Sequence, residues 1–346
     1  MTSNLQAVPT HAPWRRVLFR HETLLFVLLL VEWLLFYHFG TTTNRRGMIV
    51  GFGTLNRQLD ILRHSCEIGL LALALTPVIL TAGIDLSVAS LLALCAILFG
   101  QLTHDASLPL VLAIPLTLLA GALGGGLNAV LVAGLRLPPL IVTLGTFSLF
   151  RGLAEALTGG AVTYSRFPPG FIALGQDRWL GLPAQAWVLV VVAIGMWVLV
   201  HRTVAGRTFR VIGFSPEGAR FAGLRTGRCL AIAYVLAGVV AAGAALIYTA
   251  RLGQAKADAA IGYELFAITA VVLGGTSIFG GVGSITGTLL GVAIIAVLKS
   301  GLGTLPVVIR MNSAEELSGL LTGVLLLVAL LPGTVPKLLS VLRVRR

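Results

Sequence analysis

The sequence predicts an all-α protein, a polytopic transmembrane helical bundle of about ten spans, and three observations support that fold class. Hydrophobic residues make up 57% of the 346 residues and charged residues only 11%, whereas soluble domains carry about 25% charged residues. The mean hydropathy is +0.96. Apolar segments near membrane-spanning length, about 17–25 residues, recur along the whole chain, and they exclude a protein made of water-soluble domains.

Ten apolar segments meet or approach spanning length. The first follows three arginines and resembles a signal peptide, but no small-x-small cleavage site follows it, so we expect an uncleaved span. The fourth is long enough to be bent or split. In chain order, the predicted spans are 23–39, 67–83, 86–103, 108–134, 138–158, 183–200, 229–249, 264–280, 284–302 and 315–335.

The turn between the second and third spans lies within Thr81–Ser90, which carries one carboxylate, that of Asp85. An ionised side chain inside a bilayer costs roughly 2.5–3.5 kcal/mol, so such residues usually mark a pathway or a packed interior. A nearby proline and glycine predict that the helix breaks here. Asp85 then either lines the pathway or caps the next helix by accepting the backbone N–H of Ser87 or Val88, and both roles stay open.

The basic residues predict one orientation. The loop 201–228 carries six arginines, so we expect it to be cytoplasmic. Six predicted spans precede this loop and four follow it, so the N-terminal tail 1–22 and the basic tail 337–346 fall on the same cytoplasmic side of a transmembrane domain 23–336. Four arginines between residues 45 and 63 would then lie outside, and we expect an interfacial helix there.

Composition also limits the kinds of partner and chemistry that the chain can have. The net charge of +12 follows from the orientation rule and from contact with anionic membrane lipid, so we expect no nucleic-acid partner. The three cysteines have no metal or disulfide spacing, and we expect them to act as small apolar residues in the packed interior. The histidines are scattered, and neither HExxH nor a G-x-S-x-G elbow occurs. We therefore expect neither an enzyme nor a metal site.

A weak internal repeat relates the two halves of the chain. Residues 83–97 align on residues 281–295, with glycine at both starts and isoleucine at both ends. Such a pair is typical of transporters built from two inverted repeats, and it predicts broken helices that meet at mid-membrane.

The glycine-rich segment 274–283 could be mistaken for a nucleotide loop, but the chain contains no Gly-Lys-Ser/Thr and the glycines miss the dinucleotide spacing. Gly283, Gly287 and Gly291 instead form a four-residue ladder of small residues, which lets helix backbones approach closely in lipid. We expect helix packing at this ladder, with a kink that lines the passage as the alternative.

Two polar pairs lie inside predicted spans. Arg151 and Glu155 are four residues apart, so they face each other on a helix and are expected to neutralise each other. Asn128 and Thr146 are expected to form hydrogen bonds between helices rather than to contact substrate.

A short helix is predicted inside the basic loop. Ser215, Pro216 and Glu217 supply a capping serine, a proline in the first turn and an acid near the positive end of the helix dipole. Small residues and exposed arginines follow. Such a helix fits either the groove of another protein or a lipid surface, and the residues alone leave both open.

Together these motifs resemble the permease family of bacterial ATP-binding-cassette sugar importers, of the ribose, xylose and galactoside type. The resemblance runs from about residue 56 to residue 332, in the family's order. This chain departs from the pattern by Ala89 and Gly218, and by Ser300 in place of asparagine. The matching blocks are Gly83–Ser90, Ile141–Thr146, Arg151–Leu153, Gly206–Gly223 and Gly262–Gly291.

The resemblance implies a multi-pass inner-membrane permease that works by alternating access. It implies three partners: a separate ATPase subunit, which hydrolyses ATP so that this chain needs no cofactor; a periplasmic sugar-binding protein; and a second permease chain, alike or different. The coupling helix would be Pro216–Gly223. The residues expected to couple to the ATPase are Ser215, Pro216, Glu217, Gly218, Ala219, Arg220, Ala222 and Gly223.

The resemblance also implies the residues of the pathway and the class of substrate. Ala89 is similar to the residue in rhamnose-type permeases and in autoinducer-2 systems, and we expect a pentose or a deoxyhexose. Autoinducer 2, nucleosides, amino acids and an ion-coupled carrier using Asp85 remain alternatives. The pathway or signature residues are Gly83, Asp85, Ser87, Ser90, Thr143, Thr146, Gly274, Gly275, Thr276, Ser277 and Gly281.

Overall fold

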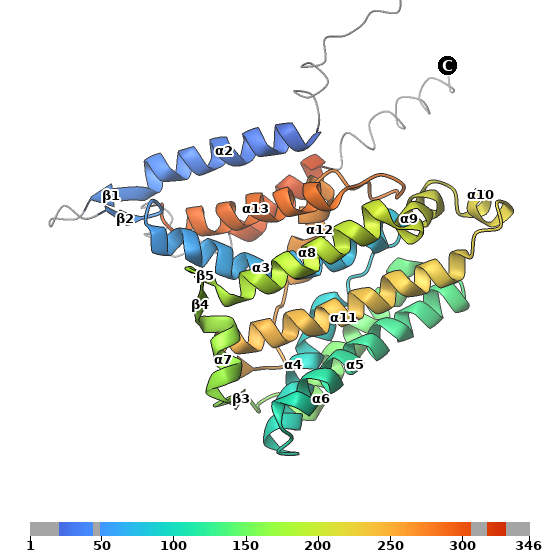
Figure 1. Cartoon of the computed structure of the whole chain (residues 1–346), viewed down its shortest axis with the longest axis horizontal. Coiled ribbons are helices and arrows are strands. Elements are labelled where there is room, and N and C mark those ends of the chain that lie inside the picture. Colours follow the sequence, from blue (N-terminus) through green and yellow to red (C-terminus); the bar gives the residue numbers. More distant parts are fainter. Residues whose placement is uncertain (1–20, 44–48, 306–316, 330–346) are drawn as a thin grey trace, which may run out of the picture.

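The computed structural model describes residues 21–43, 49–305 and 317–329, and it shows the predicted polytopic helical bundle. Long helices run roughly alongside one another, and short two-stranded sheets lie among their connections (Figure 1). The arginines before the first span, Arg45 and Arg46, and the basic tail 337–346 lie outside the described residues.

The helices follow the apolar segments closely. They are α2 (His21–Gly40), α3 (Leu55–Leu80), α4 (Val88–His104), α5 (Leu110–Ala129), α6 (Pro139–Thr158), α7 (Pro169–Gln176), α8 (Ala184–Arg202), α9 (Val204–Phe214), α10 (Pro216–Phe221), α11 (Thr226–Leu252), α12 (Tyr263–Leu273), α13 (Ile285–Leu302) and an unlabelled helix, Leu317–Ala329. The antiparallel strand pairs are β1 (Thr41–Thr43) with β2 (Ile49–Gly51), β3 (Tyr164–Ser165) with β6 (Gln254–Ala255), and β4 (Arg178–Trp179) with β5 (Leu182–Pro183).

All ten predicted segments contain a helix, but within the described residues only seven helices are long and apolar enough to cross a membrane alone. The three shorter ones are Val88–His104, Tyr263–Leu273 and Leu317–Ala329. The predicted span 264–280 is wrong at its end, since α12 stops at Leu273. Gly275 adopts a φ of +87° directly afterwards, a conformation that turns the chain out of the helix.

The fourth predicted span is indeed irregular. After α5 ends at Ala129, the helix continues as one π-helical turn, Val130–Gly134. Such wider turns insert a residue into the helical ladder and bend its course.

The second predicted span starts too late. Helix α3 begins at Leu55, where Thr54 accepts the backbone N–H of Arg57 at 3.3 Å. Arg57 and Arg63 therefore lie on the first turns of α3 itself, and the prediction of a separate interfacial helix is wrong for this stretch. The N-cap and the apolar face that continues upstream of residue 67 extend the helix.

Helix α3 forms the centre of the bundle and α2 its edge. The most apolar window of α3 is 83% buried, whereas that of α2 is 17% buried. Helix α11 packs against α3, α4 and α5, while α2, α5, α6 and α8 expose many large apolar side chains. In a bilayer, exposed apolar faces contact lipid or another membrane chain.

Two ends of the bundle can be distinguished. At the end that carries α9 and α10, a His21 ring nitrogen lies 3.0 Å from the Leu273 carbonyl oxygen, and Ile285 N donates to the His201 ring at 3.3 Å. The start of α2, the end of α8 and the start of α13 thus lie together. We call this the α10 end; the opposite end, with α7, β1–β2 and β4–β5, is the α7 end (Figure 1).

Candidate functional site

Helix α10 starts as predicted. The Ser215 side chain accepts the backbone N–H of Gly218 at 3.0 Å, and Pro216 occupies the first turn. Gly223 closes the helix with a φ of +74°, which favours glycine. Within α10, Ala219 is buried, and the exposed coupling residues are Pro216, Glu217, Gly218, Arg220, Ala222 and Gly223.

Two aromatic residues that the sequence analysis missed flank this helix. Phe214, the last residue of α9, is 86% exposed, and Phe221, the last residue of α10, is 92% exposed. Large apolar side chains this open to solvent often mark protein-binding surfaces when they gather at one place. The sequence pattern that could have indicated this surface is a pair of phenylalanines on either side of a short stretch of charged and small residues.

The end of α9 contacts both helix breaks through its backbone. A side chain at Gly213 would overlap the carbonyl oxygen of Leu80 and the backbone nitrogen of Gly281. Those two groups are themselves hydrogen bonded, since Gly281 N donates to Leu80 O at 2.9 Å. The break after α3, the break after α12 and the end of α9 therefore form one contact, which we call the glycine junction.

The glycine junction corrects one prediction about the repeat. Gly281, the first residue of the second aligned segment, binds the carbonyl of Leu80 directly before the Thr81–Ser90 break. The two breaks thus meet beside Gly213 at the α10 end, and not midway along the bundle. Helix α4 starts only after this break and runs back into the bundle, so the break lies at a turn between two helices.

The glycine ladder lies against α12 and the turn after it. An added side chain at Gly287 would overlap the carbonyl of Gly274, and one at Gly291 would overlap that of Ala270. Gly283 faces Thr276, whose hydroxyl is buried with no hydrogen-bond partner among the described residues. Small residues on one helix thus bring two backbones into contact.

The rest of this signature segment forms a tight turn. Ser277 N donates to Val282 O at 2.9 Å, and its hydroxyl accepts the N–H of Phe279 at 3.3 Å. Gly275 faces the ring of His21. The turn thereby connects α12 to α13 and to the start of α2.

Asp85 binds protein groups from two helices. One carboxylate oxygen accepts the N–H of Ser87 at 2.8 Å and its hydroxyl at 2.6 Å, and the other accepts the Asn128 amide at 3.4 Å. The side chain is 2% exposed. The bond to the Ser87 N–H closes an Asx turn directly before α4, so the carboxylate is satisfied where it enters a low-dielectric interior.

The network around Asp85 extends into α5 and α6. Asn128 donates to the Ser87 hydroxyl at 2.8 Å and accepts from Thr146 at 2.8 Å, which confirms the hydrogen bonds between helices predicted for both residues. Thr143 donates to Ile84 O at 3.0 Å, and Ser90 donates to Ser87 O at 2.9 Å. The start of α4 is therefore fixed by polar bonds on several sides.

Tyr234 lies beside this network and was not singled out from the sequence. It is fully buried on α11, and its hydroxyl would be 2.7 Å from a side-chain carbon added at Gly83. That close approach explains why the signature glycine has no side chain there. A tyrosine in the middle of an apolar span was the available signal.

Arg151 makes its hydrogen bonds to backbone carbonyls and not to Glu155, although the Glu155 carboxylate still attracts the guanidinium as predicted. One Arg151 nitrogen donates to the carbonyl oxygens of Ala257 and Ala259, the latter at 3.0 Å, and Glu155 is exposed. The two residues share a helix face, but the connection between α11 and α12 offers carbonyl acceptors closer to the guanidinium. A guanidinium with five N–H donors binds such carbonyls readily.

The strongest charge contact at the α7 end was also missed. Arg251 Nε lies 2.6 Å from Glu67 Oε1, and the Glu67 side chain is fully buried. This pair connects α3 to the end of α11. Its sequence signal was weak, because Glu67 stands at the first position of a predicted span and Arg251 follows the end of another.

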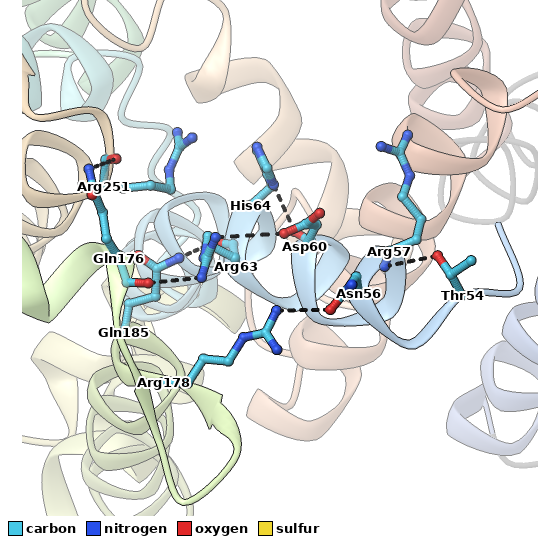
Figure 2. A network of polar contacts seen from close by, with 10 residues as sticks. All are labelled: Thr54, Asn56, Arg57, Asp60, Arg63, His64, Gln176, Arg178, Gln185 and Arg251. Atoms are coloured by element: carbon cyan, nitrogen blue, oxygen red, sulfur yellow. Dashed lines mark hydrogen bonds and ion pairs between the residues drawn. The ribbon is translucent and has the colours of Figure 1, made fainter. Parts of the chain in front are cut away.

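Polar bonds also fix the start of α3 at this end. Arg63 donates to Gln176 O at 3.0 Å, and Gln185 donates to Arg63 O at 2.7 Å. Arg178 donates to Asn56 at 3.1 Å (Figure 2). The segment with α7 and β4–β5 is thereby attached to α3.

Residues 58–330 match the family described as branched-chain amino acid transport system / permease component. Three relatives are described as autoinducer 2 import system permease protein LsrD. That of Yersinia enterocolitica is 40% identical over 75% of this chain and 78% of its own length. Those of Yersinia pseudotuberculosis and Photorhabdus laumondii are 40% and 39% identical, each over 81% of this chain and 85% and 86% of their own lengths. No solved structure matches the chain.

Proposed function

The chain belongs to this family of transport-system permease components, and from that premise we propose that it is the membrane subunit of an ATP-binding-cassette importer for autoinducer 2. The family and the seven apolar helices make it a multi-pass membrane transporter component rather than an enzyme. The proposal adds the direction of transport, the coupling site, the partners and the solute.

One observation carries the coupling proposal: an exposed short helix, α10, that begins three residues after Gly213 of the glycine junction and packs on α9. Its neighbours Phe214 and Phe221 offer an apolar surface to a partner, and α9 contacts both helix breaks by backbone. A lipid surface would explain the aromatic residues but not the rigid connection inward. A cytoplasmic ATPase subunit is therefore the proposed partner of α10.

The same geometry supplies a mechanism for alternating access. If the ATPase pulls or rotates α10, the movement reaches Leu80 and Gly281 through contacts that have no flexible side chain between them. The helices that start after each break, α4 and α13, would then tilt together. ATP binding would favour one arrangement and the loaded binding protein the other, since a ligand shifts a conformational equilibrium by its differential affinity.

Orientation follows from the same placement. With α10 cytoplasmic, the start of α2 is cytoplasmic as well, because it lies at the α10 end. The α7 end then faces the outside and would receive the periplasmic binding protein. We propose that a second permease chain, a copy or a paralogue, completes the pathway.

The solute is proposed from the relatives, three of which are described as autoinducer 2 import permeases with about 40% identity. Autoinducer 2 therefore replaces a pentose or deoxyhexose as the first candidate for the solute. A rhamnose-like deoxyhexose stays as the second candidate because of Ala89, the one departure inside the Gly83–Ser90 motif.

The test is uptake by a reconstituted complex. The chain is placed in vesicles with its ATPase, binding protein and second permease, and uptake of autoinducer 2, rhamnose, ribose and leucine is measured. We expect ATP-dependent uptake of autoinducer 2 above that of the other solutes. Uptake driven by an ion gradient without ATP would contradict the proposed ATP-driven importer. Faster uptake of rhamnose than of autoinducer 2 would contradict the proposed solute.

A further inference from the structure

A polar cavity at the α7 end has no role in the coupling described above. It has a volume of about 180 Å³ and lies between the first turns of α3, the start of α12 and the end of α13. Its remaining walls are Ser65 and aliphatic side chains of α3 and α13. Its principal polar residues are Arg57, Asp60, His64, Tyr263, Lys299 and Ser300, and we call it the α3 cavity.

Helix periodicity explains why three of these residues face the same space. Arg57, Asp60 and His64 follow a spacing of three and then four residues, which places them on one side of a helix. Figure 2 shows them on one side of α3, whereas Asn56 points to Arg178 on another. These side chains line an open cavity, in which His64 and part of the Asp60 carboxylate remain exposed.

The polar groups of the cavity are incompletely satisfied by the protein. Arg57 donates to Ser300 O at 3.0 Å, but its Nε is buried with no hydrogen-bond partner among the described residues. The Asp60 carboxylate is 3.7 Å from Arg63, beyond hydrogen-bond length. One His64 ring nitrogen contacts its own helix, at 2.7 Å from Asp60 O. The buried Arg57 Nε needs a partner, and a bound solute would supply one, while the accessible Asp60 and His64 side chains are open to the same solute.

One aromatic side chain, that of Tyr263, lines the cavity, and Phe266 lies nearby outside the lining. The Lys299 ammonium lies 5.6 Å from the centroid of the Tyr263 ring and 4.9 Å from that of Phe266. Together with the aliphatic side chains, the Tyr263 ring suits the C–H face of a solute ring. Cations, a carboxylate and hydroxyls on the other walls suit hydroxyl groups, which both donate and accept.

The cavity also has room for a solute: its volume of about 180 Å³ can hold one small sugar-like ring.

We infer that the α3 cavity binds one small neutral polyhydroxylated solute, as the site that first receives the transported molecule within this chain. The inference rests on the proposed function for its direction of transport. It adds the location of a binding site and the residues that recognise the solute.

A thiol placed in the cavity wall tests this directly. Ala296, on α13, lines the cavity, and the transporter carrying Ala296→Cys in nanodiscs is treated with a small methanethiosulfonate. Cys66 and Cys95 are buried and Cys229 lies on α11 near the α10 end, so the unsubstituted transporter supplies the background rate. Ribose, rhamnose, autoinducer 2 and galacturonate are added as protecting solutes.

We expect at least one neutral solute to slow modification, and Asp60→Asn to raise the concentration needed by about tenfold, the effect of one charged hydrogen bond. Asp177→Asn is the matched control, because this carboxylate is exposed at the same end and does not line the cavity. It should leave protection unchanged. Protection by galacturonate alone, or an equal effect of both substitutions, would overturn the inference.

ATP-driven uptake, measured in parallel, separates this inference from the proposed function. Normal uptake with no protection by any solute means that the α3 cavity is not a solute site, while the importer stands. Protection without ATP-driven uptake of any solute means that the proposed function fails, while the cavity stands.

Discussion

The two ends of the bundle are built from different contacts. At the α10 end, glycines bring three backbone segments together, and the exposed groups are two phenylalanines and several arginines. At the α7 end, side chains make the connections: a buried ion pair, arginine–carbonyl bonds and a polar cavity.

One chain thus combines a stiff joint at one end with an adaptable receiving surface at the other. Backbone contacts without intervening side chains leave little freedom, so displacement at one segment moves the next. Long polar side chains can rearrange their hydrogen bonds when a solute arrives. The α10 end is thus suited to transmit movement and the α7 end to bind and release.

The largest effect on stability is expected from the buried pair at the α7 end. Glu67→Ala leaves Arg251 without its carboxylate, and a broken buried pair costs about 3–5 kcal/mol. The midpoint of thermal unfolding in detergent should fall strongly. The double variant Glu67→Met with Arg251→Met should recover most of that loss, since it leaves no unpaired charge. A double variant less stable than Glu67→Ala would contradict the assignment.

The next largest effect tests the glycine junction. Gly213→Ala forces α9 away from Leu80 and Gly281, with an expected cost of up to about 3 kcal/mol from overpacking and loss of uptake. Gly195→Ala on α8 is the control, because no described atom lies within 4 Å of the added carbon. Unfolding midpoints and ATP-driven uptake are measured for both. Equal uptake by the two variants would show that the junction transmits nothing.

A smaller effect is expected at the start of α4. Asp85→Ala removes the acceptor of the Ser87 N–H and the Asn128 amide, at about 1–3 kcal/mol for buried groups left unpaired, and should impair uptake. Asp85→Asn keeps one acceptor oxygen and should lie between this variant and the wild type. Uptake and unfolding midpoint both unchanged in Asp85→Ala would mean that the carboxylate is dispensable.

The smallest effect on stability, with a large effect on coupling, is expected at the exposed surface of α10. Phe221→Ala should change the free energy of unfolding by less than about 0.5 kcal/mol, because Phe221 is 92% exposed. It should nevertheless reduce transport-linked ATP hydrolysis by about tenfold if the ring docks on the ATPase. Leu180→Ala is the matched control, an equally exposed apolar residue at the α7 end. The same loss in both variants would refute docking at α10.

The coupling helix can also be disrupted by charge. Glu217→Arg places a cation at the positive end of the α10 dipole and reverses a charge on the proposed docking surface. We expect membrane insertion to persist while transport-linked ATP hydrolysis is lost. Normal hydrolysis in this variant would remove Glu217 from the interface.

Several contacts could be predicted because they depend on neighbours in sequence. The capped start of α10 follows from Ser215 and Pro216. The break after α3 was predicted from a proline and a glycine, but Pro77 lies inside α3 and the helix ends only at Leu80. The hydrogen bond between Asn128 and Thr146 was predictable in kind, since polar groups in apolar spans seek partners on other helices. The partner of Arg151 was not, because helix spacing offers Glu155 whereas the fold offers carbonyls from a distant connection.

The helical membrane fold, the positions of most helices and the segments that break could all be predicted from the sequence, because hydrophobic length and backbone propensity are local properties. The tertiary structure alone decided that Gly213 contacts both breaks at the α10 end, that Glu67 pairs with Arg251, and that Arg57, Asp60 and Lys299 share one cavity. The physical reason is that these contacts join residues far apart in the chain. Which helices become neighbours depends on the packing of whole faces, and no local pattern records it.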